Sequence, residues 1–298
     1  MNFAMASGLN KKYFWNKGFD PRKLVTGIAA ALAKHVPGSG PEATPDGVRL
    51  VNAMSADARI TDIRYMAYML ATACKEAREI RKYPRPVLDK KHKPVVNSKT
   101  GQPVMKDVKL WSVFQPIEES GHGAGRDYFR PVKVAAVGAN VMITEQDGDQ
   151  FTVMPNGTYT GVRTKRGMPT RGSSATGAVS KVYQEAAGVE HAYFGRGLVQ
   201  LTWWNTYAAA GVELGLGLEL LTDPDKLLDF DISYKVMTGG MLEGKSFANG
   251  MKCSQYFTDG TTDYWNARNM VNGNDKLQEI VDLANAFEAL LMDARVQA

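Results

Sequence analysis

A run of apolar residues at helical spacing constrains the fold of this chain more than any other feature. Between Ile63 and Ala77 the apolar side chains recur at intervals of three and four positions, which places them on one face of an α-helix. The residues on this face are Ile63, Met66, Ala67, Leu70, Ala73, Cys74 and Ala77. The pattern predicts a helix over residues 63–77 that packs on a core through one buried stripe.

Glu76 lies near the end of this predicted helix. At ~100° per residue it falls about 120° from the centre of the apolar stripe, beside Met69 and near Tyr65 and Thr72. A carboxyl group at such a border between core and solvent suits a general acid, because partial desolvation favours its protonated form. The alternative is an ordinary surface glutamate on an amphipathic helix.

Composition excludes several classes of protein. The 298 residues are 44% hydrophobic and 22% charged, with a formal net charge of +5, which is typical of a globular chain rather than a disordered one. No apolar stretch is long enough to span a membrane, and the basic run before residues 24–36 does not fit a signal peptide. The two cysteines and four scattered histidines show no metal-binding spacing, so we expect neither a metal nor a cofactor.

Three further clusters carry polar chemistry. The first, residues 115–128, has two adjacent carboxylates, Glu118 and Glu119, ahead of a glycine-rich stretch; its alternative is a solvated turn. The second, residues 191–207, mixes aromatic side chains with Arg, Gln, Thr and Asn, as sugar and nucleic-acid sites do; its alternative is an aromatic core segment. The third, residues 265–274, precedes the last predicted helix and either caps that helix or binds a ligand.

The chain between these clusters is predicted to contain strands. Residues 83–86 and 95–104 suggest two short extended pieces around a turn. Asp147-Gly148 and Asn156-Gly157 each separate short β-favouring runs, which predicts a three-stranded antiparallel meander within 141–162. Residues 164–177 are expected to form a polar loop. A final helix is predicted to start at Asp275, with Gln278 completing a box-like cap.

One motif resembles a known family. Tyr193-Phe-Gly-Arg-Gly-Leu-Val-Gln-Leu-Thr-Trp203 is similar to the Y-x-G-R-G-x-x-Q-L-T-W signature of glycoside hydrolase family 19, which includes chitinases and phage endolysins. Three more segments agree in order: the helix ending in Glu76, the Gln-Pro-Ile-Glu-Glu-x-Gly-x-Gly segment, and Arg268-x-x-x-Asn272-Gly. The four segments frame roughly residues 60–291, so the resemblance covers most of the chain, although the middle matches poorly.

The resemblance implies an inverting glycosidase. Glu76 would be the general acid, Glu119 or its neighbour Glu118 the base that activates water, and Thr202 would help to hold that water. The residues that would bind substrate are Tyr193, Arg196, Gln200, Trp203, Arg268 and Asn272. The implied fold is mainly α (α+β), a lysozyme-like helical fold of the family 19 chitinase type with a small antiparallel β insertion.

The chain also departs from the family pattern. Lys75 and Ala77 flank the acid where family members carry other residues, and the usual sugar-contacting asparagine falls at Thr206. Glu76 and Glu119 are 43 positions apart, which is wider than in the phage relatives. We therefore expect a single two-lobed catalytic domain over 1–298, with insertions at 78–110 and 141–177.

The expected function is hydrolysis of bacterial peptidoglycan by a phage endolysin or a virion-associated lysozyme. Its partners would be peptidoglycan and phage virion proteins, with no nucleic acid and no membrane insertion. It would be made in the host cytoplasm without a signal peptide and act on periplasmic or cell-wall peptidoglycan. The alternatives are a chitinase, a non-catalytic virion or wall-binding protein with a decayed hydrolase fold, and a cysteine peptidase or amidase that uses Cys74 with His191.

Overall fold

The chain folds into a mixed arrangement of helices and strands. The structure is a computed structural model, and it describes residues 12–15, 18–123, 126, 128, 131–146, 148–161, 190–271, 273 and 276–296. Of these residues 44% are helical and 20% lie in strands, which form three sheets. The expected mainly α, lysozyme-like helical fold with only a small β insertion is therefore wrong. The sequence-based expectation failed because it did not anticipate the strands at residues 105–112, 132–137 and 190–191.

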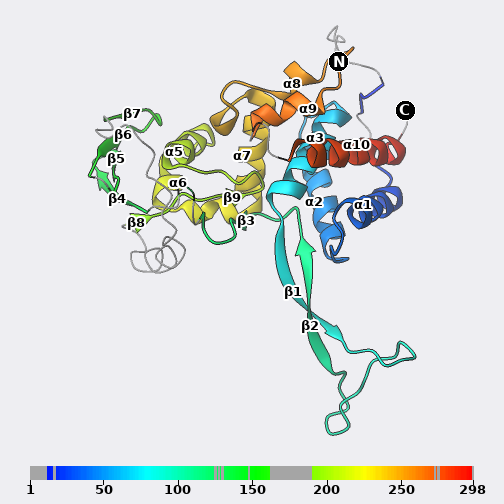
Figure 1. The fold of residues 1–298 in the computed structure, drawn as a ribbon. Coiled ribbons are helices and arrows are strands. Elements are labelled where there is room, and N and C mark those ends of the chain that lie inside the picture. The colour runs from blue at the N-terminus through cyan, green and yellow to red at the C-terminus, as the bar shows by residue number, and fades with distance from the viewer. Residues whose placement is uncertain are drawn as a thin grey trace.

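Four long helices form one end of the molecule (Figure 1). They are α1 (Pro21–His35), α2 (Ala43–Ala56), α3 (Ile63–Glu76) and α10 (Leu277–Ala294). Helix α3 packs against α10 and α2, and α1 packs against the same two helices. Asp62 caps α3 by accepting a hydrogen bond from the backbone N–H of Arg64. The predicted helix over 63–77 is thus observed one residue shorter, with Ala77 as its C-cap.

Helix α3 is more deeply buried than a single apolar stripe would allow. All of its residues from Ile63 to Cys74 except Tyr65 are buried, including Met69 and Thr72, which are fully enclosed. The side of the helix that carries Glu76 therefore faces protein for most of its length. Glu76, in the last turn, is half-buried.

A second group of helices, most of them short, occupies the middle of the molecule (Figure 1). These are α5 (Trp204–Glu213), α6 (Glu219–Thr222), α7 (Phe230–Glu243), α8 (Cys253–Tyr256) and α9 (Tyr264–Ala267), with the 3₁₀ turns η2 (Pro224–Leu228), η3 (Ser246–Ala248) and η4 (Arg268–Met270). A two-stranded ladder lies beside them, formed by β3 (Ile117–Glu118) and β9 (Arg196–Gly197). No helix in the described part of the chain is both long and apolar enough to cross a membrane.

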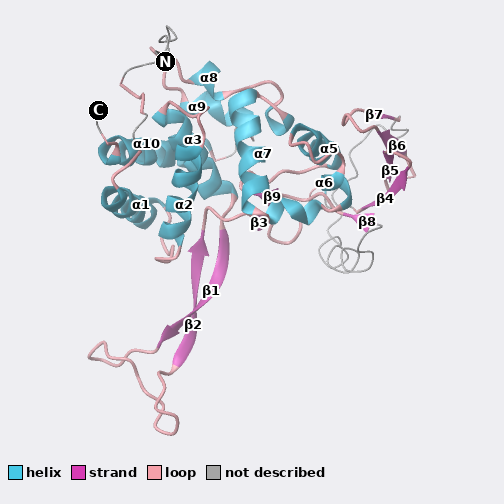
Figure 2. Cartoon of the chain, turned by 180° about the vertical axis from the view of Figure 1, so that it is seen from behind, coloured by secondary structure: helices cyan, strands magenta, loops and turns pink. Residues whose placement is uncertain are grey.

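A five-stranded antiparallel sheet forms the other end of the molecule (Figure 2). Its strands run in the order β7 (Tyr159–Thr160), β6 (Gln150–Val153), β5 (Asn140–Thr144), β4 (Val132–Val137) and β8 (Glu190–His191). The predicted three-stranded meander corresponds to β5, β6 and β7. The sheet is attached to α5 through Trp204, whose indole N–H donates to Glu145 at 3.0 Å and whose ring contacts Phe151 and Tyr159.

The remaining strands form a long hairpin, which we call the basic arm (residues 79–112). Strand β1 (Glu79–Pro86) pairs antiparallel with β2 (Met105–Ser112), and Figures 1 and 2 show that the hairpin projects away from the helices. The segment at 95–104 lies in the tip between the strands, where Val96 and Pro103 form an isolated antiparallel bridge and the N–H of Gly101 donates to the carbonyl of Asn97 in the turn between them. The predicted polar loop at 164–177 and the predicted cap at Asp275 lie outside the described residues.

Candidate functional site

The carboxylate of Glu76 is paired with a buried arginine. Oε1 of Glu76 lies 2.6 Å from Nη2 of Arg268, whose side chain is 1% exposed. Arg268 begins η4, and the preceding turn is held to α3 because the Tyr68 hydroxyl donates to the carbonyl of Ala267 at 2.9 Å. The Glu76 side chain is 15% exposed although its Oε1 atom is fully enclosed, so its other atoms reach solvent. This glutamate therefore has one fixed side and one open side.

Lys75 does not pair with Glu76. Its ammonium lies 2.7 Å from Oε2 of Glu279 on α10, and Arg78 lies 2.9 Å from the other oxygen of the same carboxylate. Burial alone would raise the pKa of Glu279, but the two cations hold it below its usual range. The charge of Lys75, which departs from the family pattern, is thus directed toward α10.

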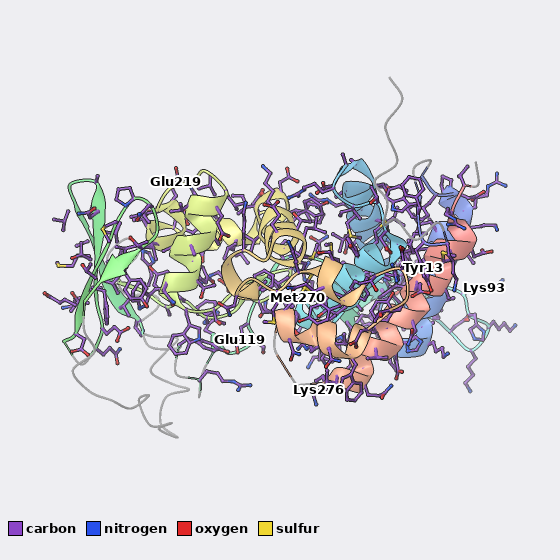
Figure 3. All side chains as sticks on the ribbon, turned by 90° about the horizontal axis from the view of Figure 1, so that it is seen from above. Tyr13, Lys93, Glu119, Glu219, Met270 and Lys276 are labelled. Carbon is purple, nitrogen blue, oxygen red and sulfur yellow. The ribbon has the colours of Figure 1, made fainter. Side chains whose placement is uncertain are left out.

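Glu119 is held by two hydrogen bonds to its carboxylate. It directly follows β3, and its backbone N–H donates to the carbonyl of Gly195 at 2.7 Å. The N–H of Gly195 in turn donates to Oε2 of Glu119 at 3.0 Å, and the hydroxyl of Tyr128 donates to Oε1 at 3.0 Å. Figure 3 shows Glu119 between the long helices and the five-stranded sheet. Both carboxylate oxygens therefore have fixed positions.

Gly195 allows this close approach because it has no side chain. A Cβ atom there would lie 2.7 Å from Oε1 of Gln200 and 3.2 Å from Oε2 of Glu119. The Gln200 amide is itself fixed, since it donates to the carbonyls of Ile117 at 3.0 Å and Gly197 at 3.1 Å. The glycine of the Tyr-Phe-Gly-Arg-Gly motif therefore sets the distance between the motif and Glu119.

Tyr128 connects the two candidate catalytic carboxylates. Burial raises the pKa of its hydroxyl, and the charge of Glu119 raises it further, with a smaller contribution from the charge of Glu76. Glu76 and Glu119 thus both lie within electrostatic range of one hydroxyl group. The ring of Trp203 packs edge-on against Tyr128, with 5.7 Å between the ring centroids. Sequence reasoning included Tyr128 in the glycine-rich cluster but gave it no role.

Glu118 has different surroundings from Glu119. Its Oε2 lies 3.2 Å from Nε2 of His122, and the His122 ring stacks on Phe194 with 4.7 Å between centroids. Successive residues of an extended segment point to opposite sides, so the two carboxylates diverge. The hydroxyl of Tyr128 and the N–H of Gly195 both bind Glu119, which favours Glu119 over Glu118 as the partner of Glu76.

The other predicted substrate-binding residues fall into two groups. Thr202 and Trp203 are half-buried beside Gln200, and Trp203 has a left-handed backbone with φ of 70° at the start of α5. Tyr193 and Arg196 are buried at 2% and 0% exposure, and they bind other parts of the protein. The Tyr193 hydroxyl donates to the carbonyl of Leu221, and Arg196 donates to Asp225, the carbonyl of Ala192 and the Tyr207 hydroxyl.

Because Tyr193 and Arg196 are buried, their side chains hold the motif in place through hydrogen bonds to the protein interior and are not available to a ligand. Their positions give the segment its shape, whereas the half-buried Gln200, Thr202 and Trp203 are its accessible members. Arg268 acts through its ion pair with Glu76. Asn272 lies outside the described residues. The mixture of polar and aromatic residues in the sequence could not show which residues of the motif are buried and which are accessible.

The cysteine of the peptidase alternative lies in an unsuitable environment. Cys74 is fully buried in α3, and burial raises the pKa of its thiol to about 12, which opposes formation of the nucleophilic thiolate. Burial also lowers the pKa of His191. Within the described residues, no group of three or more His, Cys, Asp and Glu side chains is arranged to hold a metal ion.

Comparisons with known proteins found no similar protein. No protein-family model matches the chain, and neither a curated protein nor a solved structure matches it. Any functional assignment therefore depends on the residues and on the geometry described above.

Proposed function

We propose that this protein is a glycoside hydrolase that cleaves the glycan strands of bacterial peptidoglycan with inversion at the anomeric carbon. The observation that carries the proposal is the pair of differently held carboxylates, Glu76 on Arg268 and Glu119 on Gly195 and Tyr128. The similarity of the surrounding motif to the family 19 signature supports it.

In this mechanism Glu76 donates a proton to the glycosidic oxygen as the bond to the anomeric carbon breaks. Glu119 removes a proton from a water molecule that attacks the opposite face of the sugar, and an inverting site leaves roughly 6.5–9.5 Å between the carboxyl groups for that water. The hydrogen bonds from Gly195 and Tyr128 keep Glu119 oriented toward the water. Thr202 would help to hold the water, and Gln200, which like Glu119 lies close to Gly195, would contact the sugar.

The setting we propose is a phage lytic or virion-associated enzyme that acts on periplasmic or cell-wall peptidoglycan. Chitin is the alternative substrate, because a cleft for amino sugars can accept either polymer. The non-catalytic alternative drew on Lys75 and Ala77, which flank Glu76, and on the insertions. The pairing of Lys75 with Glu279 weakens the part of this argument that rests on Lys75, since its ammonium group binds a different carboxylate.

The test measures the release of reducing ends from purified peptidoglycan by the wild-type protein and by Glu76→Gln, Glu119→Gln and Glu118→Gln. Removal of a general acid or base lowers the rate by about 10²–10⁴-fold. We expect losses of this size for Glu76→Gln and Glu119→Gln. Glu118→Gln is the matched control, because it changes the neighbouring carboxylate, and it should stay within about threefold of wild type.

The stereochemistry of the product gives a second reading. NMR of the first products should show the anomer opposite to that of the substrate bond. Retention of configuration, or full activity of both Glu76→Gln and Glu119→Gln, would exclude the proposed mechanism. Turnover of chitin oligomers with no turnover of peptidoglycan would assign the site to the alternative substrate.

A further inference from the structure

The basic arm is attached directly to the candidate site at both of its ends. Strand β1 begins three residues after Glu76, and β2 ends seven residues before Glu119. Figure 1 shows the arm leaving the body of the molecule near the C-terminal end of α3 and close to β3. The base of the arm is therefore within a few residues of both carboxylates in the chain.

The arm carries the positive charge of the whole chain. Residues 79–112 contain nine Lys or Arg residues and three Asp or Glu residues, a formal charge of +6 in a chain whose total is +5. The residues outside the arm together carry a formal charge of −1. A second copy of this chain is therefore not negatively charged enough overall to attract the arm.

Most of these cations have no anionic partner within the described part of the chain. Arg81 pairs with Glu79 and Arg85 with Glu42, but the lysines are exposed and form no ion pair with any residue that the structure describes. They are Lys82, Lys90, Lys91, Lys93, Lys99, Lys106 and Lys109.

Two of the lysines face each other across the hairpin. Lys82 on β1 is the direct partner of Lys109 on β2, so their side chains leave the same face of an exposed two-stranded ladder. Like charges directly opposite each other destabilise a strand pair, and an isolated two-stranded hairpin is only marginally stable in water. An anionic group bound between the two ammonium groups would relieve this repulsion.

Protection of open strand edges is the alternative explanation for lysines in a hairpin. Pro84 and Pro86 already interrupt the edge of β1, since proline has no N–H to donate. Four of the lysines lie at 90, 91, 93 and 99, in the tip between the strands, where they protect no strand edge. Edge protection therefore does not account for the charge of the tip.

The apolar side chains of the arm indicate the kind of anion. Exposed aliphatic residues accompany the lysines, whereas the tip at residues 87–104 contains no Phe, Tyr or Trp. Stacking on nucleobases uses aromatic faces, so single-stranded nucleic acid is a poor match for this tip. Short peptides with carboxylates and methyl groups match both features. The exposed aliphatic residues are Ile80, Leu88, Val95, Val96, Val104 and Met105.

We infer that the basic arm binds the anionic peptide stems of peptidoglycan and thereby holds the glycan strand at the candidate site. The inference rests on the proposed function and deepens it, because it names the part of the substrate that is recognised outside the cleft. The lysines bind stem carboxylates, and the aliphatic side chains contact the stem methyl groups. Chitin carries neither group, so the arm selects peptidoglycan over chitin.

The test compares binding of two charge-matched variants to insoluble peptidoglycan by co-sedimentation. Both are made in the Glu119→Gln background, so that binding is measured without turnover. The tip variant changes Lys90, Lys91, Lys93 and Lys99 to Gln; the control variant changes four exposed lysines elsewhere. The tip should keep its shape, because Asp89 and Asn97 accept hydrogen bonds from backbone N–H groups there. The control lysines are Lys34, Lys133, Lys235 and Lys252.

We expect the tip variant to bind peptidoglycan at least ~10-fold more weakly at low ionic strength, because exposed charges interact over the Debye length. The control variant should bind within about twofold of the parent. Amidation of the stem carboxylates should weaken binding of the parent to the level of the tip variant, and chitin particles should not distinguish the two variants. Circular dichroism checks that both remain folded.

Equal binding of the tip and control variants would overturn the inference. So would tip-dependent sedimentation with anionic phospholipid vesicles or with DNA when peptidoglycan binding is unchanged. A failure of the proposed function gives a different result: the wild-type protein would release no reducing ends, while tip-dependent binding to peptidoglycan would persist. If the tip variant binds peptidoglycan as well as the control variant while the wild-type protein still releases reducing ends, the binding role of the arm is refuted and the proposed function is not affected.

Discussion

Glu76 and Arg268 are 192 positions apart in the chain, and their side chains meet at 2.6 Å at the end of α3. The carboxylate is half-buried and the guanidinium is almost fully buried. This ion pair joins the first helical cluster of the chain to the segment before the last helix. The pair fixes the enclosed Oε1 atom of Glu76, while other atoms of the same side chain reach solvent.

Replacement of Arg268 by Met should destabilise the protein. Removing one partner of a buried ion pair leaves the other charge uncompensated, and we expect the free energy of unfolding to fall by about 3 kcal/mol. Lys23→Met is the control, because Lys23 and Asp293 form an ion pair whose side chains are 53% and 71% exposed. Urea unfolding should show a change below ~1 kcal/mol for that variant. Similar values for the two variants would contradict a structural role for the Glu76 pair.

Tyr128→Phe should impair turnover more than stability. The change removes the donor to Oε1 of Glu119 and costs about 1 kcal/mol of unfolding free energy. Tyr234→Phe is matched, since its hydroxyl lies 3.2 Å from a carboxylate oxygen of Asp57, away from the site. We expect similar stability for both variants and a fall in kcat of about 10-fold or more for Tyr128→Phe alone. Equal kcat values for Tyr128→Phe and Tyr234→Phe would show that Tyr128 has no role in turnover.

Gly195→Ala should disturb the site without unfolding the protein. The new Cβ would meet the Gln200 amide oxygen at 2.7 Å, so Gln200 must move and lose its bonds to the backbone. We expect a loss of activity of about 10²-fold, because small displacements of catalytic groups have effects of that size. Gly239→Ala, in the interior of α7 with no atom within 4 Å of the new Cβ, should be neutral or stabilising by up to ~1 kcal/mol. Thermal unfolding and reducing-end release measure both.

Lys109→Glu should stabilise the hairpin of the basic arm and at the same time weaken its binding to peptidoglycan. It converts a like-charge pair with Lys82 into an opposite-charge pair, which should stabilise the strand pairing by roughly 0.2–1 kcal/mol. Hydrogen exchange of the β1 and β2 amides should therefore slow. Binding to peptidoglycan should weaken in the same variant. Faster exchange, or unchanged binding, would show that the two lysines do not face a shared anion.

Stability should fall at alkaline pH because of buried tyrosines. Burial raises the pKa of Tyr68 and of Tyr193 above the usual value near 10. Above pH ~10 the unfolded chain releases protons that the folded chain keeps, so the free energy of unfolding decreases as pH rises, while below pH ~10 this contribution is complete. Tyrosinate absorbance should rise together with loss of circular dichroism. A gradual rise of all tyrosines in the folded protein would contradict this.

The sequence predicted elements whose signals are local. The α3 helix, the meander of β5 to β7 and the final helix each follow from periodicity or from turn residues within a short window. Strand β4 was missed although it pairs with the neighbouring β5 across the two-residue turn between Val137 and Asn140. Strand β8 was missed because it is only Glu190–His191 and pairs across more than fifty positions with Val132 and Lys133. A pairing of that kind depends on tertiary packing, which no short window contains. The mainly helical fold was expected because the resemblance implied it, although the middle of the chain, which holds most of the strands, matches the family pattern poorly.

The candidate site was predicted in part. Glu76 and Glu119 were both named from the sequence, and the choice between Glu118 and Glu119 could not be made there, because neighbouring residues differ only in the side they face. Arg196 and Tyr193 were placed in the cleft because polar and aromatic residues look alike whether they bind sugar or backbone carbonyls. The structure resolves this through their burial.

The base of the basic arm has one more consequence. Glu79 and Ser112 are direct partners across the hairpin, so the chain leaves the body and returns to it at a single point. The 32 residues between them add length without separating the flanking segments. Such a hairpin can be shortened, extended or exchanged during evolution while Glu76 and Glu119 stay where they are. The binding proposed for the arm and the cleavage proposed for Glu76 and Glu119 can then change independently of each other.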